Sequence, residues 1–265
     1  MIEIEKNFDL AQTLDCGQAF RWTQKEDFWL GCVKNKVLKI CEKDDKIILD
    51  CDENDFEKIW KNYFDLNTDY IKIRTELSEL SPVLKQAADF APGIHILCQD
   101  PWEALCSFII SQNNNIPRIK GIIWKLCENF GEDLGEIYSF PSAETVAKLS
   151  LDDLAPIKSG FRAKYILSAA NAVLNQEIDM ENLYTMPLDA ARKELMKIKG
   201  VGPKVADCAL LYGFHRTSCF PMDVWMKRAM ETLFPNNSPE DFGENAGIAQ
   251  QYIFHYSRMN PNLFE

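Results

Sequence analysis

A lysine and an aspartate, Lys204 and Asp223, have sequence surroundings that could support covalent chemistry. Lys204 is expected in the first turn of a helix with apolar neighbours, and both settings lower the pKa of an ammonium group. A neutral amine is a nucleophile. Asp223 is predicted to be a helix N-cap, from where its carboxylate could also stabilise a sugar cation. The pair indicates attack on a sugar carbon, although most such lysines only bind phosphate and most such aspartates only cap a helix.

The residues before Lys204 have the pattern of two helices joined by a tight hairpin. The first helix is expected over 188–198 and is stopped by Gly200. Gly202 is expected to take a backbone conformation closed to other residues, and Pro203 suits the first position of the second helix. Free amides from Gly202 to Val205 would then point at an approaching phosphate. This predicts contact with a nucleic-acid backbone rather than with a base sequence.

Two kinds of element must position these residues. Residues 2–51 contain short β-rich runs (IEIE, AFRW, FWLGCV, KVLKIC and KIILDC) separated by the turns 34–36 and 43–46. They predict an antiparallel meander. Residues 54–64 place apolar side chains on one helical face, which is expected to cover one side of the sheet.

The remaining pattern is helical. Helices are predicted at 69–80, 82–90, from Pro101 to the asparagine run, and at 143–149, 162–175, 188–198, 223–234 and 245–257. The predicted fold class is therefore α+β, with an antiparallel sheet lobe over 1–98 and an all-helical lobe over 99–265. The helix-hairpin-helix occupies 188–213 of the second lobe.

The amino-acid composition limits which partners, cofactors and cellular locations fit this chain. The net charge of −11 opposes long-range attraction to nucleic acid. Residues 187–230, however, contain eight Lys or Arg against four acids, a local charge of +4 that leaves −15 for the rest. A basic working face on an acidic body can still bind DNA, with strong salt dependence. The nine cysteines form no CxxC pair and are expected to be reduced core thiols, so neither a metal nor a cofactor is predicted. The absence of a signal peptide or an apolar span predicts no membrane contact and a cytoplasmic protein.

Several motifs in register resemble one family. KGVGPKVADC followed by FPMDVWM is similar to the helix-hairpin-helix DNA glycosylases, and to their 8-oxoguanine glycosylase and lyase branch. CGQAFRW, QDPWEALCSFIISQNNNIPRIKG, SGFRAKY and GIAQQYIF match that branch in the same order, so the resemblance spans nearly the whole chain. It implies a TBP-like sheet lobe, an HhH-GPD helical lobe, and a DNA duplex containing oxidised guanine as the partner of a monomer in a bacterial- or archaeal-like cell, at the nucleoid.

The resemblance also implies roles for individual residues. Lys204 would attack C1′ of an extruded nucleotide, Asp223 would stabilise the cationic sugar, and the excised base would shuttle protons before β-elimination nicks the strand. Cys208 and Phe254 would sandwich the purine. The other implied contacts are Gln250 to the Watson–Crick edge, the Gly17 carbonyl to the N7 hydrogen of 8-oxoguanine, Asn113, Arg118, Phe161 and Arg162 at the opposite base, and Gly200, Gly202, Val205 and Trp225 at DNA phosphates.

Two residues depart from the family pattern. Trp225 replaces a histidine common in animal and fungal members, and Phe161 replaces a tyrosine before Arg162. The second change implies a looser preference for cytosine opposite the lesion. Two other functions remain open: a monofunctional glycosylase acting on alkylated bases through Asp223 and water, and a non-catalytic duplex-binding module that uses only the hairpin.

Overall fold

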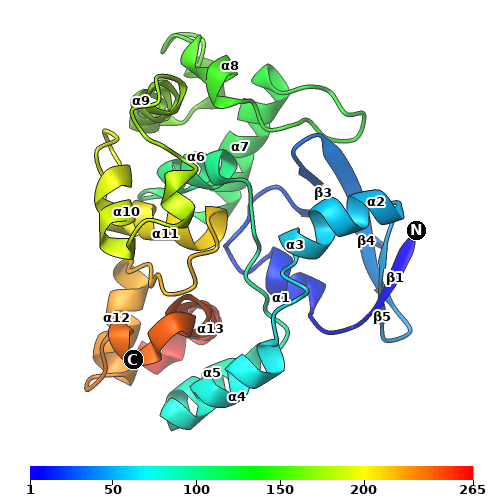
Figure 1. Cartoon of the computed structure of the whole chain (residues 1–265), viewed down its shortest axis with the longest axis vertical. Helices are drawn as coiled ribbons and strands as arrows, with labels where there is room; N and C mark the ends of the chain where they lie inside the picture. The colour runs from blue at the N-terminus through cyan, green and yellow to red at the C-terminus, as the bar shows by residue number, and fades with distance from the viewer. Residues whose placement is uncertain (265) are drawn as a thin grey trace.

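The structure is a computed structural model that describes residues 1–264. Its N-terminal part is a five-stranded antiparallel sheet in the order β1-β5-β4-β3-β2 (Figure 1). The strands are β1 (Ile2–Glu5), β2 (Thr23–Gln24), β3 (Trp29–Val33), β4 (Lys36–Lys43) and β5 (Lys46–Leu49). The predicted meander is confirmed for β3, β4 and β5, which tight turns connect.

The strand predicted from AFRW is wrong. Residues 19–22 are buried but make no ladder, and the strand there is only the two residues of β2. The indole ring of Trp22 lies flat over Gly31, where a Cβ would come within 2.4 Å of the ring. Trp22 Nε1 also donates a 2.8 Å hydrogen bond to Tyr63 Oη. The apolar run therefore serves to place the Trp22 side chain in the core, which alternation alone does not reveal.

Helices make up most of the remaining chain, and their bounds lie close to the predicted ones. They are α1 (Leu10–Leu14), α2 (Glu53–Asp55), a π-helical turn (Phe56–Trp60), α3 (Lys61–Tyr63), α4 (Tyr70–Leu80), α5 (Pro82–Phe90), α6 (Pro101–Ser111), α7 (Ile116–Phe130), α8 (Ala143–Ala147), α9 (Ala163–Leu174), α10 (Leu188–Leu195), α11 (Pro203–Gly213), α12 (Val224–Leu233) and α13 (Ala246–Met259). Short 3₁₀ turns lie at Ala155–Ile157, Gly160–Arg162, Asn182–Tyr184, Pro239–Asn245 and Pro261–Phe264. Within the described chain, none of these helices has both the length and the apolar character that crossing a bilayer requires.

Two hydrophobic cores underlie this α+β architecture. The smaller core packs β3, β4 and β5 against the aromatic residues of 56–64, as the helical face predicted. The larger core fills the helical lobe. Helices α4 and α5 contribute to this larger core, away from the sheet (Figure 1). Helix α5 packs against α13, and α4 packs against α5 and the turn Pro239–Asn245. The lobe boundary at residue 98 stays a prediction.

His95 is buried in the segment that leads from α5 to α6. Its ring stacks on Tyr70 with 3.8 Å between centroids, and its Nδ1 lies 2.9 Å from the carbonyl oxygen of Phe64. Burial lowers the pKa of His95 below its ordinary value of 6.5, against the opposing effect of the Phe64 carbonyl. The folded state therefore favours the neutral form of the His95 ring over the protonated form. Stability from this residue is complete above about pH 6.5 and is lost as the pH falls toward the lower folded-state pKa.

Replacing His95 by Phe should reduce the loss of stability that the protein suffers when the pH is lowered. The variant keeps an aromatic ring on Tyr70 but has no proton to gain, so its melting temperature should fall less than that of the wild type between pH 7.5 and pH 5. Thermal unfolding at several pH values measures this slope. A residual slope is expected from His255, whose pKa is also lowered by burial and by Arg258. Parallel curves for variant and wild type would contradict the assignment.

Candidate active site and DNA interface

The hairpin between α10 and α11 has the predicted fold with two corrections. Helix α10 ends at Leu195, earlier than the predicted Ile198, because Ile198 N bonds to Leu195 O in a tight i−3 turn. The positive φ of +91° belongs to Gly200, whose missing Cβ lets the ring of Tyr165 approach. Gly202 instead is extended, with φ −100° and ψ −179°, so the prediction of a special backbone conformation there is wrong. A Cβ on Gly202 would meet nothing within 4 Å, and its amide donates to no backbone carbonyl among the described residues.

Lys204 lies at the second position of α11 and borders two adjoining cavities. Its Nζ is 3.4 Å from Ser111 Oγ and 5.2 Å from the centroid of the Phe108 ring. One cavity has a volume of about 390 Å³ and the other of about 40 Å³. Both are lined by the same five residues, Gly17, Phe108, Lys204, Asp223 and Phe254. The lysine is therefore half-buried at the mouth of a concave site rather than extended into solvent.

Asp223 borders the same two cavities from the other side. The predicted N-cap is confirmed, because its Oδ1 accepts a 2.8 Å hydrogen bond from Met226 N at the start of α12. The other carboxylate oxygen has no hydrogen bond within residues 1–264. The cap fixes the side chain, and one oxygen stays available to a charge that develops in the cavity.

The residues assigned to the base pocket lie together around the smaller cavity. Cys208 and Gln250 are buried, and Phe254 is half-buried. Gly17 has φ +96°, and a Cβ there would lie 3.5 Å from the Phe254 ring and 3.5 Å from Arg258 Nη1. Burial raises the pKa of the Cys208 thiol to about 11, although the neighbouring Lys204 opposes the rise. The neutral Cys208 thiol and the Phe254 ring are weakly polar surfaces, and a flat heterocycle could lie between them.

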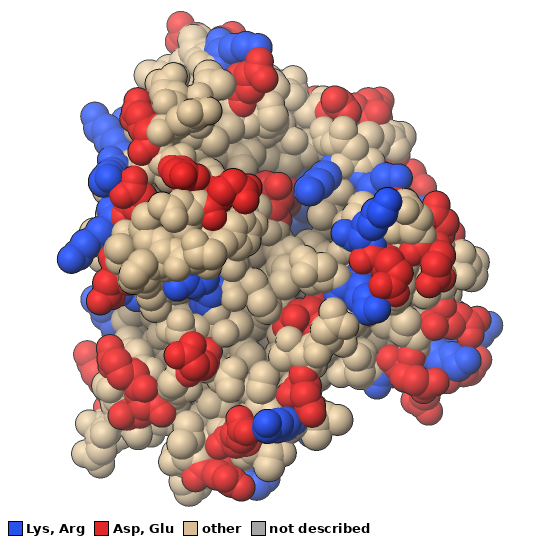
Figure 2. All heavy atoms as spheres, viewed as in Figure 1, with Lys and Arg blue, Asp and Glu red and all other residues tan. Residues whose placement is uncertain are grey.

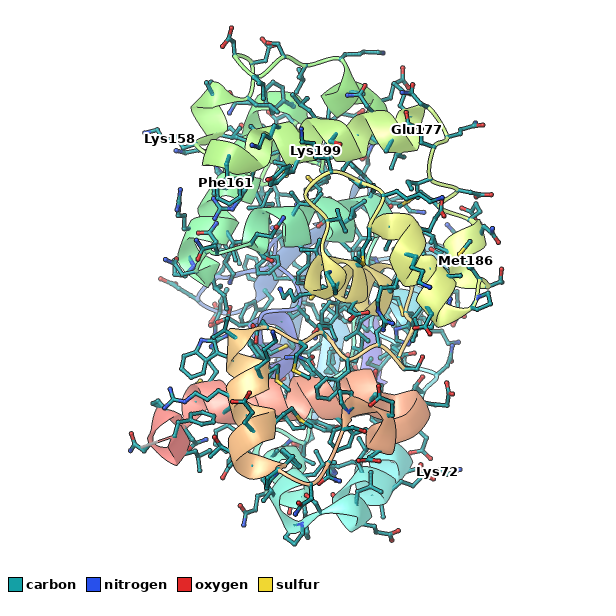
Figure 3. All side chains as sticks on the ribbon, turned by 90° about the vertical axis from the view of Figure 1, so that its left-hand side faces the viewer. Lys72, Lys158, Phe161, Glu177, Met186 and Lys199 are labelled. Carbon is teal, nitrogen blue, oxygen red and sulfur yellow. The ribbon has the colours of Figure 1, made fainter. Side chains whose placement is uncertain are left out.

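The residues assigned to the opposite base form a separate group beside the start of α7. Asn113 is exposed, with a positive φ of 47°, and Arg118 is exposed one turn into the helix. Phe161 is 48% exposed, 4.4 Å from the guanidinium of Arg162. Figure 3 shows Phe161 on the same side of the molecule as Lys199 of the hairpin.

Arg162 itself is buried, with 2% of its surface exposed. Its Nε donates a 2.9 Å hydrogen bond to Gln112 O, its Nη2 a 2.8 Å bond to Asn113 O, and its Nη1 a 3.2 Å bond to Ser159 O. Arg162 therefore holds the asparagine loop in place, while one of its two Nη1–H donors has no hydrogen-bond partner among the described residues. Burial and the charge of Arg118 lower the pKa of Arg162.

Charge is unevenly distributed over the surface. Figure 2 shows acidic and basic side chains interspersed over one face, with one group of Lys and Arg along its left-hand edge, where α9 and α10 lie. The exposed lysines of α10 and the hairpin are Lys193, Lys197 and Lys199. Trp225, 44% exposed, packs edge-on against Phe264 and borders the larger cavity. Of these exposed lysines, Lys197 pairs with Glu194 at 2.6 Å, and the basic face at the hairpin stays a prediction.

Among residues 1–264, three side chains that could together bind a metal ion lie away from the Lys204 cavities. Ligand atoms of Asp65, Cys98 and His215 lie within 4.8 Å of one another. The Asp65 carboxylate already accepts 2.8 Å hydrogen bonds from Tyr70 Oη and Thr68 Oγ1, and it pairs with His215 Nε2 at 3.2 Å. Burial and the nearby Asp65 raise the pKa of the Cys98 thiol to about 12. These contacts fit a hydrogen-bonded cluster that links residues 65–70 to His215 better than a metal centre.

Sequence reasoning missed several side chains at the site. The cavities that Lys204 borders are also lined by Phe108, Ser111, Tyr212 and Gln251. Phe108 and Ser111 are three residues apart on α6, a helix that the sequence showed only as apolar and buried. The sequence signal that could have identified this helix as part of the site was the hydroxyl of Ser111, at the end of the apolar run. Tyr212 and Gln251 had no local signal.

Two family models cover most of the chain. The model described as the N-terminal domain of 8-oxoguanine DNA glycosylase matches residues 1–105, and the model of the HhH-GPD superfamily of base excision DNA repair proteins matches residues 106–245. An N-glycosylase/DNA lyase of Saccharomyces cerevisiae is 35% identical over 250 residues, which are 83% of this chain and 66% of that protein. This chain therefore spans just under two thirds of the yeast protein's length.

Two solved structures superpose closely. MBOgg1 in complex with a low-affinity DNA ligand gives a TM-score of 0.92 at 42% identity, covering 97% of this chain and 94% of the other. The 8-oxoguanine glycosylase/lyase of Clostridium acetobutylicum, bound to duplex DNA with cytosine opposite 8-oxoguanine, gives 0.89 at 38% identity, covering 97% and 93%. The family matches and this likeness agree over nearly the whole length, and the chain belongs to the HhH-GPD superfamily of base excision DNA repair proteins, in the branch that carries the 8-oxoguanine DNA glycosylase N-terminal domain.

Proposed function

We propose that this protein is a bifunctional base-excision repair enzyme that removes 8-oxoguanine from duplex DNA and nicks the strand at the resulting site. The observation that carries the proposal is the shared cavity that brings Lys204, Asp223, Gly17 and Phe254 together from four separate parts of the chain. A monofunctional enzyme that activates water would not need a half-buried amine there. A duplex-binding module would need only the hairpin. The arrangement therefore favours covalent catalysis.

The chemistry follows from the positions of the two groups. A base inside a duplex cannot present C1′ to Lys204, so the nucleotide must first leave the stack and enter the cavity. The lone pair of the Lys204 nitrogen bonds to C1′ as the bond from C1′ to N9 breaks, and N9 keeps the electron pair of the broken bond. The excess proton on Nζ passes to the departing base. Asp223 stabilises the positive charge that develops on the sugar.

Strand cleavage then uses the same lysine. Ring opening gives a Schiff base between Nζ and C1′, which acidifies the hydrogen atoms on C2′. Loss of one C2′ proton breaks the C3′–O bond and releases the downstream 5′-phosphate end. The departed base carries the protons, since no other general base borders the cavity within the described chain apart from Asp223. Cys208 and Phe254 enclose the base, and Gln250 contacts its Watson–Crick edge.

Binding of the duplex uses the surface around this cavity. The open amides near Gly200, Gly202 and Val205 grip phosphates, and Trp225 packs at the rim against the sugar-phosphate chain. Asn113, Arg118 and Phe161 face the base opposite the lesion, with Arg162 supporting their loop. We further propose that the protein acts as a monomer in the cytoplasm of a bacterium or archaeon, with the lobe boundary near residue 98.

Borohydride trapping tests the proposal directly. Wild-type protein is mixed with a duplex containing one 8-oxoguanine opposite cytosine, reduced, and separated on a denaturing gel. A covalent protein–DNA band and a nicked strand are expected, and raising the salt concentration should weaken both because phosphate contacts drive binding. Release of the base without a trapped band would indicate the monofunctional reaction. Equal binding of damaged and intact duplexes with no product would indicate a binding module.

A further inference from the structure

The short loop that carries Gly17 is held in place by buried glutamines. Gln18 is completely buried, and its Nε2 donates hydrogen bonds of 2.9 Å to Thr13 O and 2.7 Å to His95 O. Its Oε1 accepts a 2.9 Å bond from Leu97 N. Three bonds from one side chain thus fix the loop to α1 and to the segment before α6. Buried polar groups bonded this fully favour a single backbone arrangement.

The backbone on both sides of Gly17 is anchored as well. Gln99 Nε2 donates a 2.7 Å hydrogen bond to Gln18 O, and Gln251 Nε2 donates a 3.3 Å bond to Cys16 O. Within residues 1–264, the carbonyl between these two, that of Gly17, receives no hydrogen bond. The loop therefore presents one unpaired carbonyl between two paired ones.

Tyr212 of α11 controls the orientation of the Gln251 amide. Its hydroxyl donates a 2.6 Å hydrogen bond to Gln251 Oε1 and lies 3.5 Å from Gln250 Oε1. With its oxygen held by Tyr212, the Gln251 amide must direct its nitrogen toward the Cys16 carbonyl. The ring of Tyr212 stacks on Phe108 at 5.2 Å, and Phe108 in turn lies under Lys204.

We propose that Tyr212 and Gln251 are positioning residues that determine substrate specificity: they hold the Gly17 carbonyl where it distinguishes 8-oxoguanine from guanine. The inference rests on the proposed function and deepens it. The relay runs from the Tyr212 hydroxyl through the Gln251 amide to the Cys16 peptide. Both side chains line the smaller cavity, but neither is hydrogen-bonded to Lys204 among the described residues. It aligns the carbonyl that receives the N7 hydrogen of the oxidised base, and the same hydroxyl restrains Gln250.

The test uses Tyr212→Phe, which removes only the hydroxyl, and Gln251→Met, which keeps the length of the side chain but cannot donate. Each should lower the rate of 8-oxoguanine excision about 10-fold, the loss expected when a buried hydrogen bond is broken and its partner left unpaired. Cleavage of a preformed abasic site, which needs Lys204 but no base recognition, should stay within about twofold. The double variant should be much less than about 100-fold slower than the wild type, because the two side chains share the 2.6 Å bond and their effects should not add.

Tyr252→Phe on α13 is the matched control, since its hydroxyl is buried without a hydrogen-bond partner within residues 1–264. It should leave both rates unchanged. Unaltered excision in Tyr212→Phe and Gln251→Met, or an equal fall in excision and abasic-site cleavage, would overturn the relay. Melting temperatures identify a variant that is merely unfolded, in which case the other one decides. Failure of the proposed function itself would be seen separately, as wild-type protein inactive on 8-oxoguanine.

Discussion

Lys204→Gln is expected to abolish both base release and borohydride trapping. Glutamine retains most of the side-chain length beside Phe108 and Ser111 but has no basic amine to bond to C1′. Loss of a covalent nucleophile lowers turnover by roughly 10³-fold or more. Single-turnover excision on an 8-oxoguanine duplex measures this loss, and a gel-shift assay on the same duplex should show that DNA binding is kept.

Lys199→Gln provides the matched control for this experiment. Lys199 is an exposed lysine in the same hairpin, but it lines neither of the two cavities that Lys204 borders. Its replacement should weaken binding at high salt by one phosphate contact while trapping persists. A Lys204→Gln protein that still forms the covalent band would show that another amine is the nucleophile, and the mechanism proposed here would then be wrong.

The position of Lys204 explains why one lysine among many can act in this way. Lys204 lies at the positive end of the α11 helix dipole. Its Nζ lies over the Phe108 ring and 3.4 Å from Ser111 Oγ. No carboxylate forms a salt bridge with it in the described part of the chain. Other lysines, such as Lys193 and Lys199, also have no salt bridge there, but Lys204 is the lysine that borders the two cavities. An amine without an ion-pair partner keeps its nitrogen available to substrate.

Features fixed by neighbouring residues were predictable from the sequence. Helix starts were correct where a capping residue precedes an apolar pattern, as at Asp100, Ser142 and Asp223, because a cap bonds only to the next turn. The meander followed from the short turns. The hairpin was recognised from its glycines, but the sequence could not tell which glycine takes the positive φ, because Tyr165 from another helix decides it.

Features that depend on distant residues were not predictable. The contact between Gln251 and Cys16 joins residues 235 positions apart, and a buried glutamine has no periodic signal of its own. Arg162 was expected to contact the opposite base, which stays a prediction, but the sequence did not show that its guanidinium also binds the carbonyls of Gln112 and Asn113 about fifty residues away. An arginine in a motif reveals its charge, whereas its burial depends on which loop folds over it. The resemblance to known glycosylases supplied the site where spacing alone left several meanings.

Asp223→Asn is the second substitution with a large expected effect, because it separates the two roles of this side chain. Asparagine caps helices as well as aspartate does, so Met226 N keeps its partner and α12 keeps its start. The negative charge facing the cavity is lost. Removing one preorganised electrostatic contact to a developing charge slows chemistry by about 10²–10³-fold, and the single-turnover rate of 8-oxoguanine release should fall by this amount.

Asp69→Asn is the control for the cap alone. Asp69 caps α4 through a 3.0 Å bond from Lys72 N and does not line either cavity. Both variants should unfold within about 1 kcal/mol of the wild type in urea, since Asn and Asp are near-equal caps, and Asp69→Asn should excise the base at the normal rate. If Asp223→Asn excised 8-oxoguanine as fast as Asp69→Asn, the carboxylate would be only a cap, and the sugar cation would have to be stabilised by the departing base instead.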